Sequence, residues 1–226
     1  SELQKADIVF SNFENPVIEG CPRRIDGMIF CAPPTMLEGL KFANINILNL
    51  ANNHTLNYGK SGLSETVNLL KKDGFVVTGI DSLAIQKVND VSFGFLGFDK
   101  SQQASPQLTE TERNLIMESD KKVDVLVVSM HWGIEYQLHP TSGQKKLAEE
   151  LVKLGADIVA GHHPHWVQDV EEINGVPVYY SLGNFVFDQM WSQATRDGLV
   201  IRLTFEGKKV IQEERLPVYM NQWAQP

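Results

Sequence analysis

Residues 159–166 read Val-Ala-Gly-His-His-Pro-His-Trp and hold three of the six histidines of the chain. The apolar run that leads into them is typical of the end of a buried strand. Gly161 lets the backbone turn sharply off that strand, and Pro164 stiffens the segment between His163 and His165. Neutral imidazole is a good ligand for Zn, Mn, Fe and Ni. We therefore expect the rings to face one metal site in front of a β-sheet; hydrogen-bonded surface histidines are the alternative.

The size and composition of the chain are those of a globular protein. Its 226 residues are 42% hydrophobic and 21% charged, which predicts a single domain over residues 1–226 with a sizeable core. Asp and Glu number 28 against 20 Lys and Arg, so the net charge is −8. Because no basic cluster resembles a reader of phosphate backbones, we expect no nucleic-acid partner. An anionic substrate would need bound cations to offset the charge of the protein locally.

Two features bear on the cellular compartment. No apolar run reaches the length of a membrane span, and no signal peptide is visible. Because the chain opens at Ser1 and a strand is expected by Asp7, we expect a targeting segment to lie outside it. Cys21 and Cys31 are the only cysteines. A disulfide between them would indicate an oxidising compartment, and two free thiols are the alternative.

Hydrophobic periodicity predicts strands that alternate with helices, the pattern of an α/β protein. Strands are expected at residues 6–10, 45–50, 75–78, 123–130, 157–160 and 176–182, with antiparallel pairs at 83–98 and 199–216. Helices are expected after a capping box at Thr35 and Glu38, at residues 61–73, after a capping box at Thr109 and Glu112, and at residues 143–154.

Five of the expected strands are followed closely by a side chain that can bind a metal or polarise a substrate. Ligands of layered α/β sheets bind beyond the carboxyl ends of the strands, so we expect these side chains to share a cleft. A mixed O and N set without thiolates suits Zn, Mn or Fe, and more than four candidate ligands leave room for two ions. Such a pair activates water for hydrolysis. The candidates are Glu14, Asn53 with His54, His131, His163 with His165, and Asn184.

Each candidate also has a structural alternative. Asn52 and Asn53 can be turn residues that tolerate a positive φ, and Asn184 can hold a turn. His54 can be a histidine at the start of a helix. Other chemistries find less support, since the chain has no G-x-S-x-G elbow, no P-loop and no G-x-G-x-x-G after a strand.

Five short motifs follow one another between about residues 7 and 188. They are Asn12-Phe13-Glu14, Ala51-Asn52-Asn53-His54 followed by Asn57-Tyr58-Gly59, His131-Trp132-Gly133-Ile134-Glu135-Tyr136, Gly161-His162-His163-Pro164-His165 and Tyr180-Ser181-Leu182-Gly183-Asn184-Phe185. In this order and spacing they resemble the CapA family, proteins of poly-γ-glutamate capsule synthesis with a metallophosphatase-like fold. The resemblance implies a four-layer α/β/β/α sandwich and a site like that of calcineurin-like phosphoesterases.

The resemblance also implies roles for single residues. Asn53 would bind a divalent metal, and His131 and His163 would bind the same ion. His165 would bind a second ion, while Glu14 stands roughly where such enzymes keep a carboxylate. His54 would assist the leaving group. We predict substrate contacts for the neighbouring polar side chains Asn12, Asn52, His162 and Asn184.

Two departures from the family pattern stand out. The family usually begins with a Gly-Asp strand that supplies an aspartate ligand, and none precedes the strand expected at residues 6–10. That strand either lies upstream of this chain or is missing, which would weaken one metal site. Asn57 stands where the family commonly has an aspartate, which removes a carboxylate near His54.

The leading hypothesis is a metal-dependent hydrolase acting on a phosphoester or on an amide bond of poly-γ-glutamate. The alternative is a non-catalytic subunit that binds the polymer or membrane-bound capsule-synthesis subunits. A third hypothesis is a histidine network without metal. We expect the protein to lie outside the cytoplasm, associated with the membrane through a segment outside this chain.

Overall fold

The computed structural model of the chain describes residues 2–22, 27–80 and 82–222, so Ser1 lies outside the described residues. A first sheet holds three short parallel strands in the order β1-β2-β3. They are β1 (Phe10–Asn12), β2 (Ile47–Asn49) and β3 (Val76–Thr78). The strand expected at residues 6–10 is too early, because Leu3–Lys5 form a 3-10 helix (η1) and pairing with β2 begins at Phe10.

The second sheet has six strands in the order β4-β5-β6-β7-β9-β8. Its inner strands β5, β6, β7 and β9 run parallel, and the two edge strands are antiparallel to their neighbours. Parallel strands covered on both faces are apolar almost throughout, which explains the long hydrophobic run of β6. The strands are β4 (Ala84–Val88), β5 (Val91–Asp99), β6 (Val125–His131), β7 (Ile158–His162), β8 (Val170–Ile173) and β9 (Val176–Tyr179).

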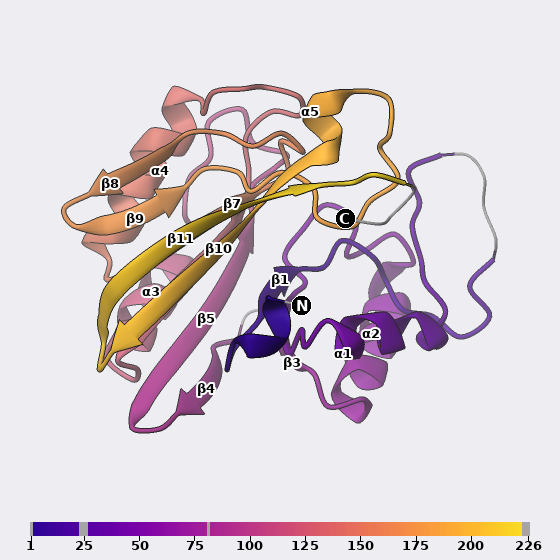
Figure 1. Cartoon of the computed structure of the whole chain (residues 1–226), viewed down its shortest axis with the longest axis horizontal. Helices are drawn as coiled ribbons and strands as arrows, with labels where there is room; N and C mark the ends of the chain where they lie inside the picture. Colours follow the sequence, from indigo (N-terminus) through magenta and orange to yellow (C-terminus); the bar gives the residue numbers. More distant parts are fainter. Residues whose placement is uncertain (1, 23–26, 81, 223–226) are drawn as a thin grey trace.

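A long antiparallel hairpin, drawn in yellow in Figure 1, is formed by β10 (Asp197–Glu206) and β11 (Lys209–Tyr219). Its apolar side chains join the cluster between the two sheets. The rings of Phe205 and Phe93 meet edge to face with centroids 5.0 Å apart, which attaches the hairpin to the second sheet.

Helices cover the outer face of each sheet (Figure 1). The apolar faces of α1 (Leu37–Phe42) and α2 (Gly59–Lys72) pack on the first sheet, and those of α3 (Glu110–Asp120) and α4 (Ser142–Lys153) pack on the second. The expected α/β/β/α sandwich is therefore confirmed. Across the described ranges, no helix is long and apolar enough to cross a membrane.

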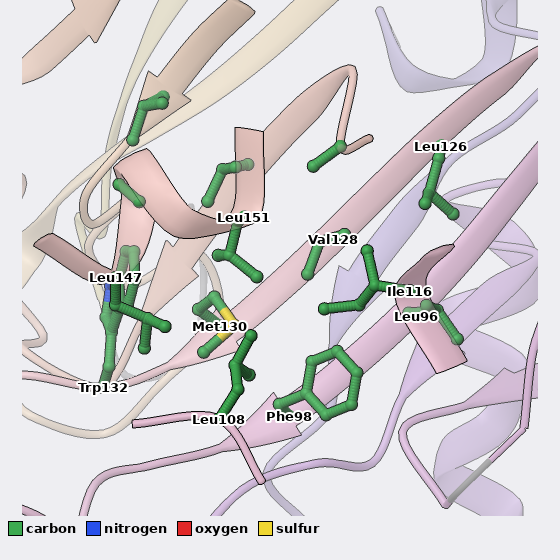
Figure 2. Close-up of a cluster of buried hydrophobic side chains, with 14 of the residues drawn as sticks. Leu96, Phe98, Leu108, Ile116, Leu126, Val128, Met130, Trp132, Leu147 and Leu151 are labelled. Carbon is green, nitrogen blue, oxygen red and sulfur yellow. The ribbon is translucent and has the colours of Figure 1, made fainter. Parts of the chain in front are cut away.

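The core beneath α3 and α4 shows how the sequence periods produce the layers (Figure 2). Alternate residues of β6 point toward the helices, and residues four apart on α4 point back toward them. The side chains that meet there are Leu126, Val128 and Met130 of β6, Ile116 of α3, and Leu147 and Leu151 of α4. A different cluster lies between the sheets and includes Ile47, Phe95 and Val127.

The two expected capping boxes have different outcomes. Thr109 and Glu112 exchange both hydrogen bonds of the box, so that prediction is confirmed. The box at Thr35 and Glu38 is wrong, because Pro34–Met36 form a 3-10 helix (η2) and the cap of α1 is Met36 without a side-chain bond. Thr35 lies inside that turn, whereas an N-cap residue needs an extended backbone.

Besides the two 3-10 helices, β8 and α5 were not expected from the sequence. β8 pairs with β9 through a tight turn at Asn174 and Gly175, whose φ values are 52° and 85°. Asn-Gly with two positive φ angles is the favoured two-residue hairpin turn, so a local signal for β8 was present. The four-residue helix α5 (Gln193–Arg196) is capped by Ser192 and has no comparable periodic signal.

Cys21 and Cys31 are joined in a disulfide with their Cα atoms 5.9 Å apart. The alternative of two free thiols is therefore wrong. The bond closes a loop that begins after β1 and returns toward the end of the same sheet, where the polar strand-end residues lie.

Candidate active site

The polar residues at the strand ends come together where the two sheets face each other. Asn53, after β2, accepts a hydrogen bond at Oδ1 from Nε2 of His131 at the end of β6, with 2.9 Å between the atoms. Glu14, after β1, places Oε1 3.6 Å from Nδ1 of the same ring. His131 is thus contacted from two strands of the opposite sheet.

A buried amide that the sequence reading omitted ties the sheets together at this end. Asn49, the last residue of β2, is fully buried and donates from Nδ2 to Asn12 Oδ1 at 3.1 Å and to Ser129 Oγ at 3.2 Å. Room for it depends on two glycines: a Cβ at Gly97 would lie 1.9 Å from Asn49 Oδ1, and one at Gly79 would lie 2.2 Å away. The sequence does contain a signal for this residue, because an asparagine at the end of an apolar strand indicates a buried polar contact.

Burial sets the protonation of the Glu14 and His131 pair. The His131 side chain is fully buried, and burial together with the neighbouring His163 holds its pKa well below the usual range. Burial raises the pKa of Glu14 to about 7, against the hydrogen bond that Asn12 Nδ2 donates to its Oε1 at 2.7 Å. The metal-free site therefore keeps a neutral imidazole beside a carboxyl that titrates near neutrality.

His163 and His165 leave β7 through an unusual backbone. Their φ angles are 98° and 59°, a region that residues other than glycine rarely adopt and that is found most often at functional sites. The ring centroids of His163 and His131 are 4.8 Å apart, and those of His165 and His163 are 6.2 Å apart. Burial lowers the pKa of both rings. His131 and His163 are therefore neighbours in the structure, and His165 lies at a greater distance from His163 than His131 does.

Three of the four predicted substrate-binding residues have their polar atoms bonded within the chain. Asn52 donates to Phe13 O and accepts from the His54 N–H, so it holds the turn after β2. Asn184 accepts from His165 Nδ1 at 2.9 Å and donates to Thr195 O, which fixes the ring of His165. Asn12 bonds to the side chains of Asn49 and Glu14, as described above. These contacts favour positioning roles for all three.

His162, the fourth, occupies the last position of β7 opposite His131 in register. Its Nε2 is buried without a hydrogen-bond partner among the described residues. Burial lowers the pKa of His162 to about 4, so the ring is neutral at physiological pH. His139, outside the predicted site, instead pairs with Asp169 at the surface, with 3.1 Å between Nδ1 and Oδ2.

The donor atoms can be tested against a divalent ion. Glu14 Oε2, His131 Nδ1 and His163 Nδ1 are all buried without a partner in the part of the chain that the structure describes. Neutral imidazole and carboxylate are the donors that Zn, Mn and Fe take, so the chemistry of the set fits. Within residues 2–22, 27–80 and 82–222, however, no three His, Cys, Asp or Glu side chains converge as a metal-binding group. Asn53 Oδ1 faces the other nitrogen of the His131 ring, Nε2, so an ion shared by Asn53 and His131 would replace that hydrogen bond.

Two acidic residues that sequence reasoning did not place in the site act on it electrostatically. The charges of Glu135, after β6, and Asp99, at the end of β5, each raise the pKa of Glu14, after the larger contribution of burial. They also raise the pKa of His163, in which burial again dominates and lowers it. Glu135 belongs to the His131–Tyr136 motif, and Asp99 pairs with His131 in register. Glu135 and Asp99 therefore add negative charge near the site, which bound cations would offset.

Aromatic side chains from three loops border the histidines. Phe30, next to the disulfide, has its ring centroid 4.3 Å from that of His54, and Phe187 lies 5.2 Å from His165. The two phenyl rings contact each other edge to face at 5.9 Å. Tyr136 also stacks on His165, with ring centroids 5.9 Å apart. Their positions depend on loops that meet only in the folded chain, so the sequence alone did not reveal this border.

Solved structures with a similar fold include a phosphatase. A novel phosphatase from Mycoplasma pneumoniae superposes with a TM-score of 0.63 at 15% identity, over 95% of this chain and 83% of its own. At this identity the likeness concerns the fold, which is metallophosphatase-like.

Two curated relatives extend the likeness to the sequence. The PGA biosynthesis protein CapA of Bacillus subtilis (strain 168) is 34% identical over 221 residues, which cover 88% of this chain and 58% of the relative. The capsule biosynthesis protein CapA of Bacillus anthracis is also 34% identical, over 88% of this chain and 54% of its own length. The chain thus spans a little over half the length of these relatives.

A family profile described as bacterial capsule synthesis protein PGA_cap matches residues 1–189. That interval contains the first four strand-end groups, from Glu14 to His165, and Asn184 of the fifth. Agreement over most of the chain, in both the fold and the sequence, is what common descent produces, and the chain belongs to the PGA_cap family.

Proposed function

We propose that this chain is a metal-dependent hydrolase of the CapA type, which cleaves a phosphoester or an amide bond of an anionic polymer such as poly-γ-glutamate. The observation that carries the proposal is that three donor atoms of the strand-end residues, Glu14 Oε2, His131 Nδ1 and His163 Nδ1, are each buried without a hydrogen-bond partner among the described residues. Buried polar atoms are normally bonded, and an isolated one is unfavourable unless a further group binds it. A divalent ion is the group that these donors suit.

The proposal distributes the ligands over two ions of Zn, Mn or Fe. Glu14, Asn53, His131 and His163 would hold the first, and His165, oriented by Asn184, would contribute to the second. When bound, such ions lower the pKa of a water molecule and offset the charge of an anionic substrate. The offset matters because the chain carries a net charge of −8 and places Glu135 and Asp99 near the site.

His54 is the residue that we assign to proton transfer at the leaving group. Burial lowers its pKa, so the neutral ring predominates at pH 7. Its Nε2 lies 3.3 Å from Asn53 Nδ2, at the edge of the proposed ligand set. Phe30 covers one face of the ring and limits the access of water to it. The lone pair of the neutral ring would first take up a proton, and the protonated ring would then donate it to a leaving group next to Asn53.

One observation favours a non-catalytic role, in which the site binds the polymer without cleaving it. The described residues hold no group of three His, Cys, Asp or Glu side chains arranged for a metal, and Asn57 cannot act as a carboxylate beside His54. A binding subunit needs the negative site to be neutralised, but it needs no proton donor for a leaving group.

The experiment that separates the two roles compares metal content with turnover. Purified protein is analysed for metals and then assayed on p-nitrophenyl phosphates and on poly-γ-glutamate with Zn, Mn or Fe. We expect turnover that His131→Ala abolishes and that the matched control His139→Ala retains, because His139 lies at the surface away from the site. Metal-dependent binding of poly-γ-glutamate without turnover in any metal would favour the binding subunit. Absence of metal binding would contradict the hydrolase.

We also propose that the protein works outside the cytoplasm, held at the membrane by a segment outside this chain and next to membrane-bound capsule-synthesis subunits. The Cys21–Cys31 disulfide supports an oxidising compartment. The names of the CapA relatives support a place in capsule synthesis. Fractionation of the native host followed by thiol labelling tests this, and a cytoplasmic, reduced protein would contradict it.

A further inference from the structure

The loop closed by the Cys21–Cys31 disulfide contacts His54 through the ring of Phe30 and through a backbone hydrogen bond of Met28, and it also binds Asn57. Phe30 stacks on the imidazole with 34° between the ring planes, and its backbone N–H donates to Asn57 Oδ1 at 2.8 Å. The neighbouring Cys31 lies 3.4 Å, through Sγ, from the hydroxyl of Tyr58. The disulfide end of the loop is therefore fixed against the segment that carries His54 and Asn57.

The direction of the hydrogen bonds determines which ring nitrogen of His54 carries the proton. A backbone N–H can only donate, so the Asn57 atom facing Phe30 must be the carbonyl oxygen. The same oxygen lies 3.2 Å from His54 Nδ1. An oxygen acceptor requires a proton on that nitrogen, so the neutral ring has Nδ1–H and a free lone pair at Nε2.

The next two contacts are consistent with this assignment. The free lone pair of His54 Nε2 accepts from Asn53 Nδ2, which turns the Asn53 oxygen toward His131 Nε2 at 2.9 Å. Every link from Phe30 to His131 then has one donor and one acceptor. If His54 carried its proton on Nε2 instead, Nδ1 and Asn57 Oδ1 would face each other as two acceptors, and Nε2 and Asn53 Nδ2 would face each other as two donors.

We propose that the disulfide-closed loop, acting through the Phe30 N–H and Asn57, holds His54 in one orientation and one tautomer with the Nε2 lone pair facing Asn53. Asn57 and the loop are positioning elements in this assignment. The loss of a carboxylate at position 57 therefore still leaves an acceptor for Nδ1–H. The consequence for catalysis rests on the proposed hydrolase function, whereas the tautomer does not.

Imidazole nitrogen NMR tests the tautomer directly on the metal-free, full chain labelled with nitrogen-15 histidine. The His54 signals are identified by their loss in His54→Gln. We expect a protonated Nδ1 and an unprotonated Nε2 in the oxidised protein. An oxidised wild-type protein with its His54 proton on Nε2 would overturn the proposal.

Three variants separate the contribution of each contact. Asn57→Leu removes the acceptor and is expected to let the Nε2–H form predominate, whereas Asn57→Asp keeps an acceptor and retains Nδ1–H. Phe30→Leu is the matched control, since it removes the ring but keeps the backbone N–H, and it should also retain Nδ1–H. A tautomer unchanged in Asn57→Leu would overturn the role of Asn57.

The loop is tested by reducing the disulfide and by the Cys21→Ser/Cys31→Ser double variant, with circular dichroism to verify the fold. We expect the Nε2–H form to appear in both. If the double variant does not fold, reduction of the folded wild type still decides, and an unchanged tautomer there would overturn the role of the loop.

Turnover provides a second readout that depends on the proposed function. Misplacing a reacting group by about 1 Å costs up to about 100-fold in rate, so kcat should fall by roughly 10- to 100-fold in Asn57→Leu with little change in KM. Should the NMR result hold while no metal supports turnover, the positioning of His54 stands and the hydrolase proposal fails.

Discussion

The two faces of β6 differ in a way that separates folding from chemistry. The face toward α3 and α4 is apolar to the end of the strand, with Leu126, Val128 and Met130. The opposite face, between the sheets, begins with Val125 and Val127 and then changes to Ser129 and His131. All seven residues of the strand are buried, so the difference lies in polarity and not in exposure.

β2 repeats this division in the facing sheet. Leu48 points to the helices, whereas Ile47 and then Asn49 point between the sheets. Asn49 bonds to Ser129 at 3.2 Å, so both inner faces change from apolar to polar at the same level. The outer faces of the two strands are thus apolar along their whole length, whereas their inner faces are apolar at one end and polar at the other. Substitutions on the two faces should therefore have different consequences.

The largest expected effect is a loss of stability from the outer face. Leu151→Ala removes a fully buried side chain from the cluster beneath α4 and should lower the free energy of unfolding by about 2–5 kcal/mol. Leu138→Ala is the matched control, because that side chain is 57% exposed, and it should change the stability little. Urea denaturation measures both. Equal losses in the two variants would contradict the comparison.

On the inner face, Glu14→Gln should change how stability depends on pH. Burial raises the pKa of Glu14 to about 7 in the folded chain, so the folded state retains a proton that the unfolded chain releases above its ordinary pKa. Wild-type stability is therefore lost as pH rises from about 4.5 to about 7, by about 3 kcal/mol, and glutamine avoids this loss. Contributions of titratable groups that do not contact Glu14 are common to both proteins and cancel in the difference.

The measurement is the free energy of unfolding of both chelator-treated proteins near pH 5 and near pH 8. We expect the advantage of Glu14→Gln to be larger at the higher pH. An advantage that is independent of pH would show that Glu14 ionises normally in the folded chain.

Added metal should offset the loss of stability that ionisation of the buried Glu14 causes. Zn or Mn at about 100 times its dissociation constant should stabilise the chelator-treated wild type by about 2.7 kcal/mol. His131→Ala should lose most of this gain, whereas His139→Ala should retain it. Thermal unfolding with and without metal measures the shift. An equal shift in both variants would place the ion elsewhere on the chain.

The sequence predicts the outer faces and the strand-end residues well because both signals are local. Apolar periodicity identifies β6 and α4, and polar residues directly after strands identify Glu14, Asn53 and His131 as neighbours. Local signals also fail where a second local preference competes. The box at Thr35 has the right spacing, but Pro33 and Pro34 lead into a 3-10 turn that places Thr35 inside the helix instead of at its cap.

The inner face is harder to predict because its contacts join segments that are far apart in the chain. Asn49 is separated from Ser129 by 80 residues, and within β2 it resembles an interruption of an apolar run. Phe30 reaches His54 only through the fold of the disulfide loop, and Glu135 acts on Glu14 through space. Residue type and spacing predict which residues are candidate ligands, but only the folded structure shows which of them contact one another.

Asn49→Ala should give the smallest effect and sharpens the comparison most. The variant leaves Asn12 Oδ1, Ser129 Oγ and the Ala51 N–H without their buried partner, which should cost about 2 kcal/mol of stability. Ser129→Ala removes one of the three contacts and should cost less. If Asn49 couples the two sheets, the double variant should be less destabilised than the sum of the single variants, because the contact is lost only once. Strict additivity in urea denaturation would mean that the two inner faces approach each other here without depending on this hydrogen bond.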